Sequence, residues 1–279
     1  MITWFFLGKG GVGKTTLALA WALTQAQQGR RTLVLSLDPA HNLRDYTGHP
    51  VGDRPAQVAE HLWIQEVDLQ RRAREVLERV LRTVRTSYRH LEVLNLERSL
   101  DTLRYSPGAE ESAHLEALEE VRKAQWEAVA VDLPPTGLAL RLIHYPFASL
   151  VWVQRLLALR QQIRRLDATI ARLRGRPPAQ DPVFQELLQL FHRYEGLIRW
   201  FRSGSVVWSV VHTPEPAAQA EAQRIQEALG RLGLPGILRV CNRCAEGVPE
   251  FKSPLRFPED FSALGRCLPP GPGESPRTG

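Results

Sequence analysis

Residues 8–16, which decide the fold, are Gly-Lys-Gly-Gly-Val-Gly-Lys-Thr-Thr. A short apolar run, residues 2–7, precedes them, and an apolar segment from Leu17 to Gln28 follows. The order of strand, G-x-x-x-x-G-K-T and helix is the context that a phosphate-binding P-loop needs. Glycines let the backbone turn its N–H groups toward phosphates at the N-terminus of a helix. The sequence therefore predicts a nucleotide site at the end of the first strand.

The side chains of this loop are predicted to have different roles in binding the nucleotide and its metal. Lys14 is suited to neutralise the β- and γ-phosphates, and the Thr15 hydroxyl to ligate Mg²⁺. Lys9 is a second cation, five residues before Lys14, which indicates charge neutralisation beyond the local site. The residues predicted to bind nucleotide in this loop are Gly8, Gly10, Gly11, Val12, Gly13, Lys14, Thr15 and Thr16.

Two further apolar runs end on a carboxylate. Residues 32–37 lead into Asp38, and residues 128–131 lead into Asp132. At the carboxyl end of parallel strands beside a P-loop, such groups orient an attacking water and hold Mg²⁺ through water. Both aspartates are therefore predicted to serve the metal, and the proline-rich segment 133–137 to form a hinged loop.

The middle of the chain has a different pattern. Apolar residues recur at alternating steps of three and four over 156–173 and again over 184–201. The turn between them ends on Asp181, a helix N-cap, and Pro182, at the first helical position. This predicts an antiparallel helical hairpin over 147–202, with its two apolar seams buried against each other.

The fold class that follows is α/β, a P-loop NTPase with a mostly parallel sheet flanked by helices and a helical subdomain containing the hairpin. The ATPase core is expected in three segments, 1–68, 126–146 and 203–268. Residues 69–125 are expected to be helical, and 269–279, rich in proline and glycine, to be a disordered tail.

Charge and cysteine content indicate which partners and which cellular compartment to expect. The net charge is +6, and residues 155–202, with ten Arg and four acidic residues, have the same net charge. A basic hairpin suits an acidic protein, anionic lipid or nucleic acid, although it could also be only a solvated face.

Three cysteines and the lack of an apolar run of about 18 residues predict a cytoplasmic protein with no transmembrane segment. Cys241 and Cys244 form a C-x-x-C pair; packing of Cys241 as a buried strand residue is preferred to a zinc site.

Three motifs together resemble the ArsA-type family of deviant-Walker ATPases, which contains arsenite-pump-driving and tail-anchored-protein targeting ATPases. They are the P-loop string, the segment Asp38-Pro39-Ala40-His41-Asn42-Leu43 and the segment Asp132-Leu133-Pro134-Pro135-Thr136-Gly137. Weaker matches are Glu66-Val67-Asp68, which closes a strand, Pro107-Gly108-Ala109-Glu110-Glu111, and Val240-Cys241-Asn242-Arg243. Leu138 stands where the family usually has a histidine.

This resemblance implies a Mg²⁺-dependent homodimer that hydrolyses ATP. It implies that Lys9 reaches the partner's nucleotide, that Asp38 activates the water in switch I and that Asp132 heads switch II. It also implies that Asn242 contacts the adenine. The catalytic residues expected on this basis are Lys9, Lys14 and Asp38.

The family's two best-known jobs fit the sequence poorly. A methionine-lined groove for apolar clients is not expected, because Met1 is the one methionine. Arsenite-pump relatives bind the metalloid through cysteines in their helical parts, and here no cysteine falls in the helical segments. The leading hypothesis is a homodimeric ATPase whose hairpin binds a protein partner or client. The alternatives are a Par/Min-type positioning ATPase and a nucleotide-gated scaffold with little hydrolysis; nucleic acid binding stays open under the first.

Overall fold

The computed structural model describes residues 1–39, 43–87, 108–175 and 181–243, together with residues 261, 265 and 268. The chain divides into two compact units. The first comprises residues 1–69, 117–142 and 200–279, and the second comprises residues 70–116 and 143–199.

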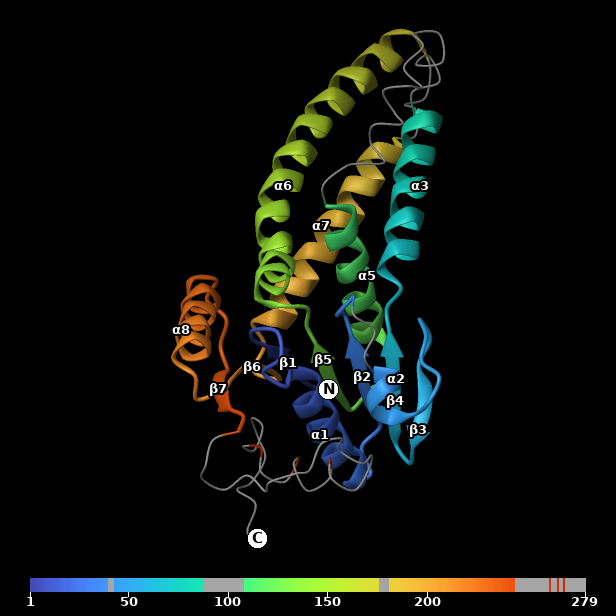
Figure 1. Cartoon of the computed structure of the whole chain (residues 1–279). Coiled ribbons are helices and arrows are strands. Elements are labelled where there is room, and N and C mark those ends of the chain that lie inside the picture. The colour runs from blue at the N-terminus through green and yellow to red at the C-terminus, as the bar shows by residue number, and fades with distance from the viewer. Residues whose placement is uncertain are drawn as a thin grey trace. The chain divides into compact units, whose positions relative to one another are not determined.

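A seven-stranded sheet organises the first unit, in the order β3-β4-β2-β5-β1-β6-β7. Every neighbouring pair is parallel except β3 and β4, which are antiparallel. The mostly parallel α/β sheet predicted from the sequence is therefore confirmed (Figure 1). Its strands are β1 (Ile2–Leu7), β2 (Thr32–Ser36), β3 (Ala56–Ala59), β4 (Leu62–Glu66), β5 (Ala128–Asp132), β6 (Val206–His212) and β7 (Ile237–Cys241). The helices wholly within this unit are α1 (Lys14–Gln27), α2 (Leu43–Thr47) and α8 (Pro216–Arg231).

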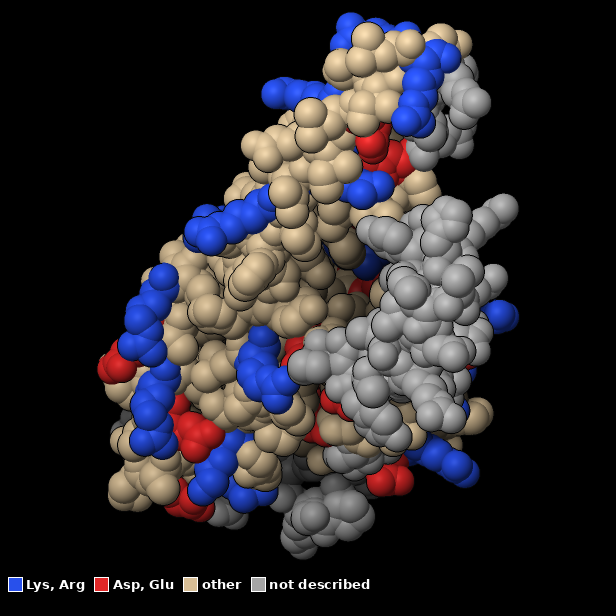
Figure 2. Space-filling view, turned by 90° about the horizontal axis from the view of Figure 1, so that it is seen from above, with Lys and Arg blue, Asp and Glu red and all other residues tan. Residues whose placement is uncertain are grey.

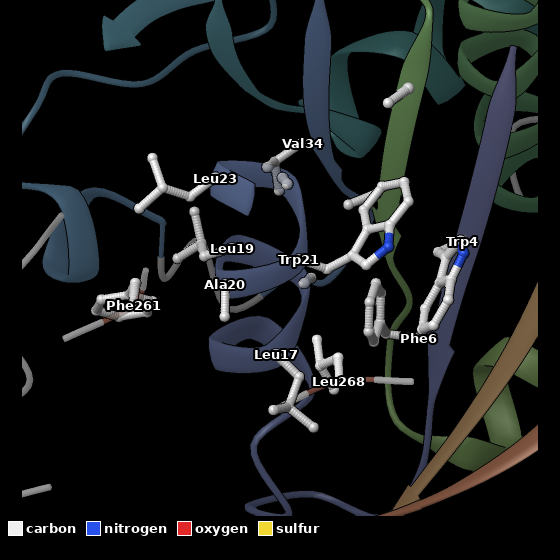
Figure 3. Close-up of a cluster of buried hydrophobic side chains, with 14 of the residues drawn as sticks. Trp4, Phe6, Leu17, Leu19, Ala20, Trp21, Leu23, Val34, Phe261 and Leu268 are labelled. Atoms are coloured by element: carbon white, nitrogen blue, oxygen red, sulfur yellow. The ribbon is translucent and has the colours of Figure 1, made fainter. Parts of the chain in front are cut away.

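Strand β1, which pairs with the central strand β5, is buried on both faces because its aromatic residues alternate between two clusters. On one face Trp4 stacks on Trp21 of α1, with ring centroids 5.3 Å apart. Figure 3 shows Trp4, Phe6 and Trp21 in the same buried cluster. On the other face Phe5 stacks on Trp208 of β6 at 4.5 Å. Continuous apolar strands are expected where helices or other segments cover both faces of a parallel sheet.

The second unit is helical. It holds all but the first residue of α3 (Leu69–Ser87), the first half of α5 (Ala109–Lys123) and most of α6 (Thr136–Leu173) and α7 (Pro182–Phe201). Glu116 of α5 joins two neighbours, because its carboxylate pairs with Arg79 of α3 at 2.5 Å and with Arg193 of α7 at 3.0 Å. Tyr145 of α6 and Tyr194 of α7 meet edge to face, with ring centroids 6.2 Å apart.

The start of α7 matches the sequence prediction. The Asp181 carboxylate accepts a hydrogen bond of 3.0 Å from the Phe184 amide, and Pro182 is the first residue of the helix. Asp181 thus caps the helix by the geometry that Asp favours at this position. The same carboxylate binds the Arg160 guanidinium of α6 through contacts of 2.9 to 3.1 Å.

Two expectations about α6 are wrong. The helix begins at Thr136 rather than near residue 147, so Gly137 lies in its first turn and Pro146 lies inside it. Its predicted seam is not buried against α7, because the seam residues between positions 156 and 173 are exposed, from 36% for Ile163 to 84% for Leu173. The side of α6 that meets α7 instead carries Arg160 and Arg164, whose guanidinium lies 4.2 Å from the centroid of the Phe184 ring.

One helix of the described residues, α6, is long and apolar enough to cross a membrane by length and composition alone.

Candidate nucleotide site

The predicted site residues gather at the edge of the sheet where the parallel strands end. Asp132, the last residue of β5, is in register with Phe6 of β1 on one side and Ser36 of β2 on the other. The P-loop leaves β1 one residue after Phe6, and Asp38 follows β2 by two residues. Open α/β sheets bind ligands at this edge, outside the carboxyl ends of the strands.

The P-loop backbone requires glycine at two positions. A Cβ on Gly8 would lie 2.2 Å from the carbonyl oxygen of Val211 in β6, so the loop can pass the strand only without a side chain. Gly13 has a φ of 91°, in the left-handed region, and a Cβ there would lie 2.3 Å from the Asn242 side-chain nitrogen. Since α1 begins at the next residue, Gly13 fixes the direction in which the helix N-terminus faces the site.

Lys14 and Thr15 occupy the first turn of α1. The Lys14 side chain is buried, and its ammonium group lies 3.5 Å from the Lys9 carbonyl oxygen. The Thr15 hydroxyl donates a hydrogen bond of 2.7 Å to Oδ2 of Asp132, which comes from a strand 117 residues further along the chain. The helix and β5 thus bring a hydroxyl, a carboxylate and an ammonium group together.

Asp132 is the most perturbed carboxylate described in the site. Its pKa is raised from 3.8 to about 7, chiefly because burial disfavours the charged form. The Thr15 hydrogen bond and the charge of Lys14 lower this pKa, while the neighbouring Asp38 and Glu66 raise it. Its second oxygen, Oδ1, is buried with no hydrogen-bond partner among the described residues.

The donor set fits Mg²⁺. A buried carboxylate oxygen without a partner, next to a threonine hydroxyl, provides hard oxygen ligands for a small divalent cation. The described residues contain no group of three or more His, Cys, Asp or Glu side chains that could hold a metal by themselves. Magnesium is usually held by one or two carboxylates together with substrate phosphates, so Thr15 and Asp132 match the coordination preference of Mg²⁺ better than that of Zn²⁺.

Sequence reasoning missed a role for Glu66, the last residue of β4. The carboxylate is buried and accepts a 2.6 Å hydrogen bond from the backbone N–H of Leu43. Leu43 begins α2, directly after the segment that starts at Asp38, so Glu66 anchors the far end of that segment. The available signal was a carboxylate at the end of an apolar strand, the same signal that identified Asp132.

The remaining predicted residues differ in their burial and in their contacts with the P-loop. The Asn242 side chain donates 2.8 Å to the Val12 carbonyl, so the predicted adenine-contacting residue is tied to the P-loop. Asp38 is half-buried, and its charge acts on Asp132. Lys9 is exposed, as is Leu138, which stands where the resemblance expects a histidine. Ala40, His41, Asn42 and Cys244 lie outside the described residues.

The expectation for Cys241 is wrong. It is half-buried and disulfide-bonded rather than packed as a buried thiol. In this state its sulfur is not the thiolate that a zinc site requires.

Comparison with known proteins agrees with this geometry. A putative arsenical pump-driving ATPase of Aquifex aeolicus is 28% identical over 84% of the chain and 77% of its own length. A second such protein from that organism is 30% identical, over 78% of the chain and 57% of its own length. The ATPase ASNA1 homolog 1 of Paramecium tetraurelia is 29% identical over 70% of the chain and 58% of its own length. The chain thus spans little more than half the length of two of these relatives. Residues 1–249 match the anion-transporting ATPase family, and the chain belongs to that family.

Proposed function

We propose that this protein is a Mg²⁺-dependent ATPase that works as a homodimer and couples its nucleotide state to the binding of a protein partner. The observation that carries the catalytic part is the pairing of Thr15 with Asp132, whose second oxygen is buried and has no partner among the described residues. Family membership supports ATP as the substrate.

Each residue of the site has a task in this proposal. The backbone N–H groups of residues 8–16 cradle the phosphates, and Lys14 neutralises their charge. Thr15 and Asp132 hold the metal, which when bound supplies positive charge at the β- and γ-phosphate oxygens. Asp38 orients the attacking water, and Asn242 contacts the adenine.

Ionisation of Asp132 is linked to cation binding. Because burial raises the pKa of this carboxyl to about 7, a bound cation would have to displace its proton over part of the neutral range. Lys14, which lies close enough to lower this pKa, favours the charged form that the cation needs.

The homodimer rests on Lys9. Its side chain is exposed, whereas Lys14, five residues later, is buried. An exposed lysine within the phosphate loop suits a contact with the nucleotide of a second protomer, as an arginine finger does when supplied in trans.

The catalytic assignment is tested by Asp38→Asn and Lys14→Ala in parallel with the exposed Glu215→Gln as a matched control. Lys14→Ala should lose ATP binding, measured with a fluorescent ATP analogue. Asp38→Asn should bind ATP but release phosphate at least about 100-fold more slowly, the scale of losing a group that positions or activates the water. If wild-type turnover is no faster than that of Asp38→Asn, the protein is a nucleotide-gated scaffold instead.

A further inference from the structure

One side of α6 carries an exposed apolar row, here called the α6 stripe. Its members follow each other at alternating steps of four and three, and their exposed fractions run from 36% to 84%. They are Trp152, Leu156, Leu159, Ile163, Leu166, Ile170 and Leu173. Contiguous apolar surface of this extent marks a place where another molecule binds.

The stripe has the register of a coiled coil. Leu156, Ile163 and Ile170 occupy one core position of successive heptads, and Leu159, Leu166 and Leu173 occupy the other. The pattern spans three heptads, about 32 Å at 1.5 Å per residue. This spacing presents knobs and holes to a single helix lying alongside, rather than to a flat or globular surface.

The second arm of the hairpin, α7, does not cover the α6 stripe. The side of α6 that is buried or half-buried carries Leu150, Val153 and Leu157, followed by Arg160, which binds Asp181 at the start of α7. These residues alternate with the stripe along the helix and face another direction. The stripe is therefore left over after the hairpin has formed.

The borders of the stripe are basic. The positions that flank a coiled-coil seam carry Arg155, Arg160 and Arg174, against the single acid Asp167, and Arg160 is already bound to Asp181. Neither Arg155 nor Arg174 has an ion pair with a described residue. Figure 2 shows Lys and Arg side chains beside uncharged areas on the face of the molecule that it presents. A second copy of the same helix would bring basic border against basic border, which disfavours self-pairing.

We propose that the α6 stripe binds an amphipathic helix of a partner protein, one whose apolar heptads are flanked by acidic residues. Apolar heptads on the partner fill the stripe, and its carboxylates pair with Arg155 and Arg174 at the borders. This assigns a chemistry to the partner of the ATPase proposed above; it rests on that function for its purpose, but the binding itself requires no hydrolysis.

The probe for the test is a synthetic, dye-labelled peptide of about four heptads, with Ile and Leu in the core and Glu at the flanking positions. Binding to the protein, residues 1–279, is measured by fluorescence anisotropy, with ADP or without nucleotide. Comparison peptides carry Lys in place of Glu, or Leu at every position. The Glu peptide should bind at least about tenfold more tightly than the Lys peptide at low salt, and the difference should shrink at high salt.

Variants locate the site. The pair Leu159→Ala and Leu166→Ala should weaken binding of the Glu peptide at least about tenfold, since truncated apolar anchors cost most at an interface. The matched control, Gln154→Ala with Gln161→Ala, changes exposed residues of the same helix outside the stripe and should leave affinity unchanged. Circular dichroism checks that helix content is equal in both.

Several results would overturn the proposal. They are no saturable binding, equal affinity for the Glu and Lys peptides, tighter binding of the all-Leu peptide, or no loss in the Leu159/Leu166 variant. Vesicle flotation or self-association that the same variant abolishes would assign the stripe to lipid or to a second copy. Phosphate release by this variant should equal that of the wild type, so a failed docking test and a failed ATPase assignment give different results.

Discussion

The Thr15 hydroxyl is bound to one oxygen of Asp132, and the other oxygen of that carboxylate is buried without a partner in the described part of the chain. A carboxylate held in this way lowers the stability of the fold when it is ionised and no cation binds its second oxygen. The relationship ties nucleotide chemistry to protein stability, because the group that serves the cation destabilises the site when no cation is there.

Asp132→Asn should therefore remove a pH dependence of stability. The raised pKa means that the native state keeps a proton between about pH 4 and pH 7 that the unfolded chain releases. Stability without Mg²⁺ or nucleotide should thus fall as pH rises through this window, by about 1.4 kcal/mol per pH unit, and level off above it. Urea unfolding of wild type and Asp132→Asn in EDTA checks this. Parallel curves for the two proteins would contradict the electrostatic account.

Glu66→Ala should impair turnover without abolishing nucleotide binding. It removes the acceptor of the Leu43 N–H and releases the far end of the Asp38 segment. A misplaced water-orienting group costs on the order of tenfold to 100-fold in kcat, with a smaller change in KM. Glu66→Gln keeps an acceptor at the same place and should recover much of the loss. Equal defects in Glu66→Ala and Glu66→Gln would show that the charge, and not the hydrogen bond, matters.

Lys9→Ala and Asp38→Asn should complement each other if Lys9 acts in trans. Each variant alone should bind ATP and turn over poorly. In a mixed dimer the Lys9→Ala protomer keeps Asp38 and receives Lys9 from its partner, so one of its two sites is complete. An equal mixture should then reach up to about a quarter of wild-type phosphate release. Activity of the mixture equal to the mean of the two variants alone would place Lys9 in its own site.

Asp181→Ala should destabilise the helical unit by about 1–2 kcal/mol, the scale of losing an N-cap and a partly exposed ion pair. Burial acts to raise the Asp181 pKa, but the hydrogen bonds from Arg160 and from the Phe184 amide outweigh it and lower the pKa. The stabilisation is therefore present above the ordinary pKa of Asp and lost as pH falls below it. The exposed Asp167→Ala is the matched control on the same hairpin. Chemical unfolding followed at several pH values tests both.

The nucleotide site could be predicted because its signals are local. Residues 8–16 carry their own turn chemistry, and Asp38 and Asp132 each end an apolar run, so parallel strands bring them together at one edge. Glu66 also ends an apolar run, but its role could not be predicted from the sequence. Its hydrogen bond to Leu43 joins two segments that only the tertiary structure brings together.

The orientation of α6 could not be predicted, because its apolar residues form more than one row. Leu150, Val153 and Leu157 lie on the side that is partly buried, while the longer row with ideal heptad spacing lies exposed. Periodicity identifies an apolar face, but it does not say which neighbour covers it when two faces qualify. The choice depends on Asp181 and Phe184, which bind arginines of α6 and fix that side toward α7.

Of the four boundaries between the two units, one follows Leu69, the first residue of α3, and the other three fall further inside helices. They lie between Glu116 and Ala117 in α5, between Leu142 and Ile143 in α6, and between Arg199 and Trp200 in α7. Domains that recombination can shuffle are bounded by flexible linkers, where a cut breaks few interactions. A crossover at any of these three boundaries would instead sever a helix. We therefore expect relatives to have acquired different partners by point substitution along helices such as α6, and chimaeras that exchange the whole helical unit to fold poorly.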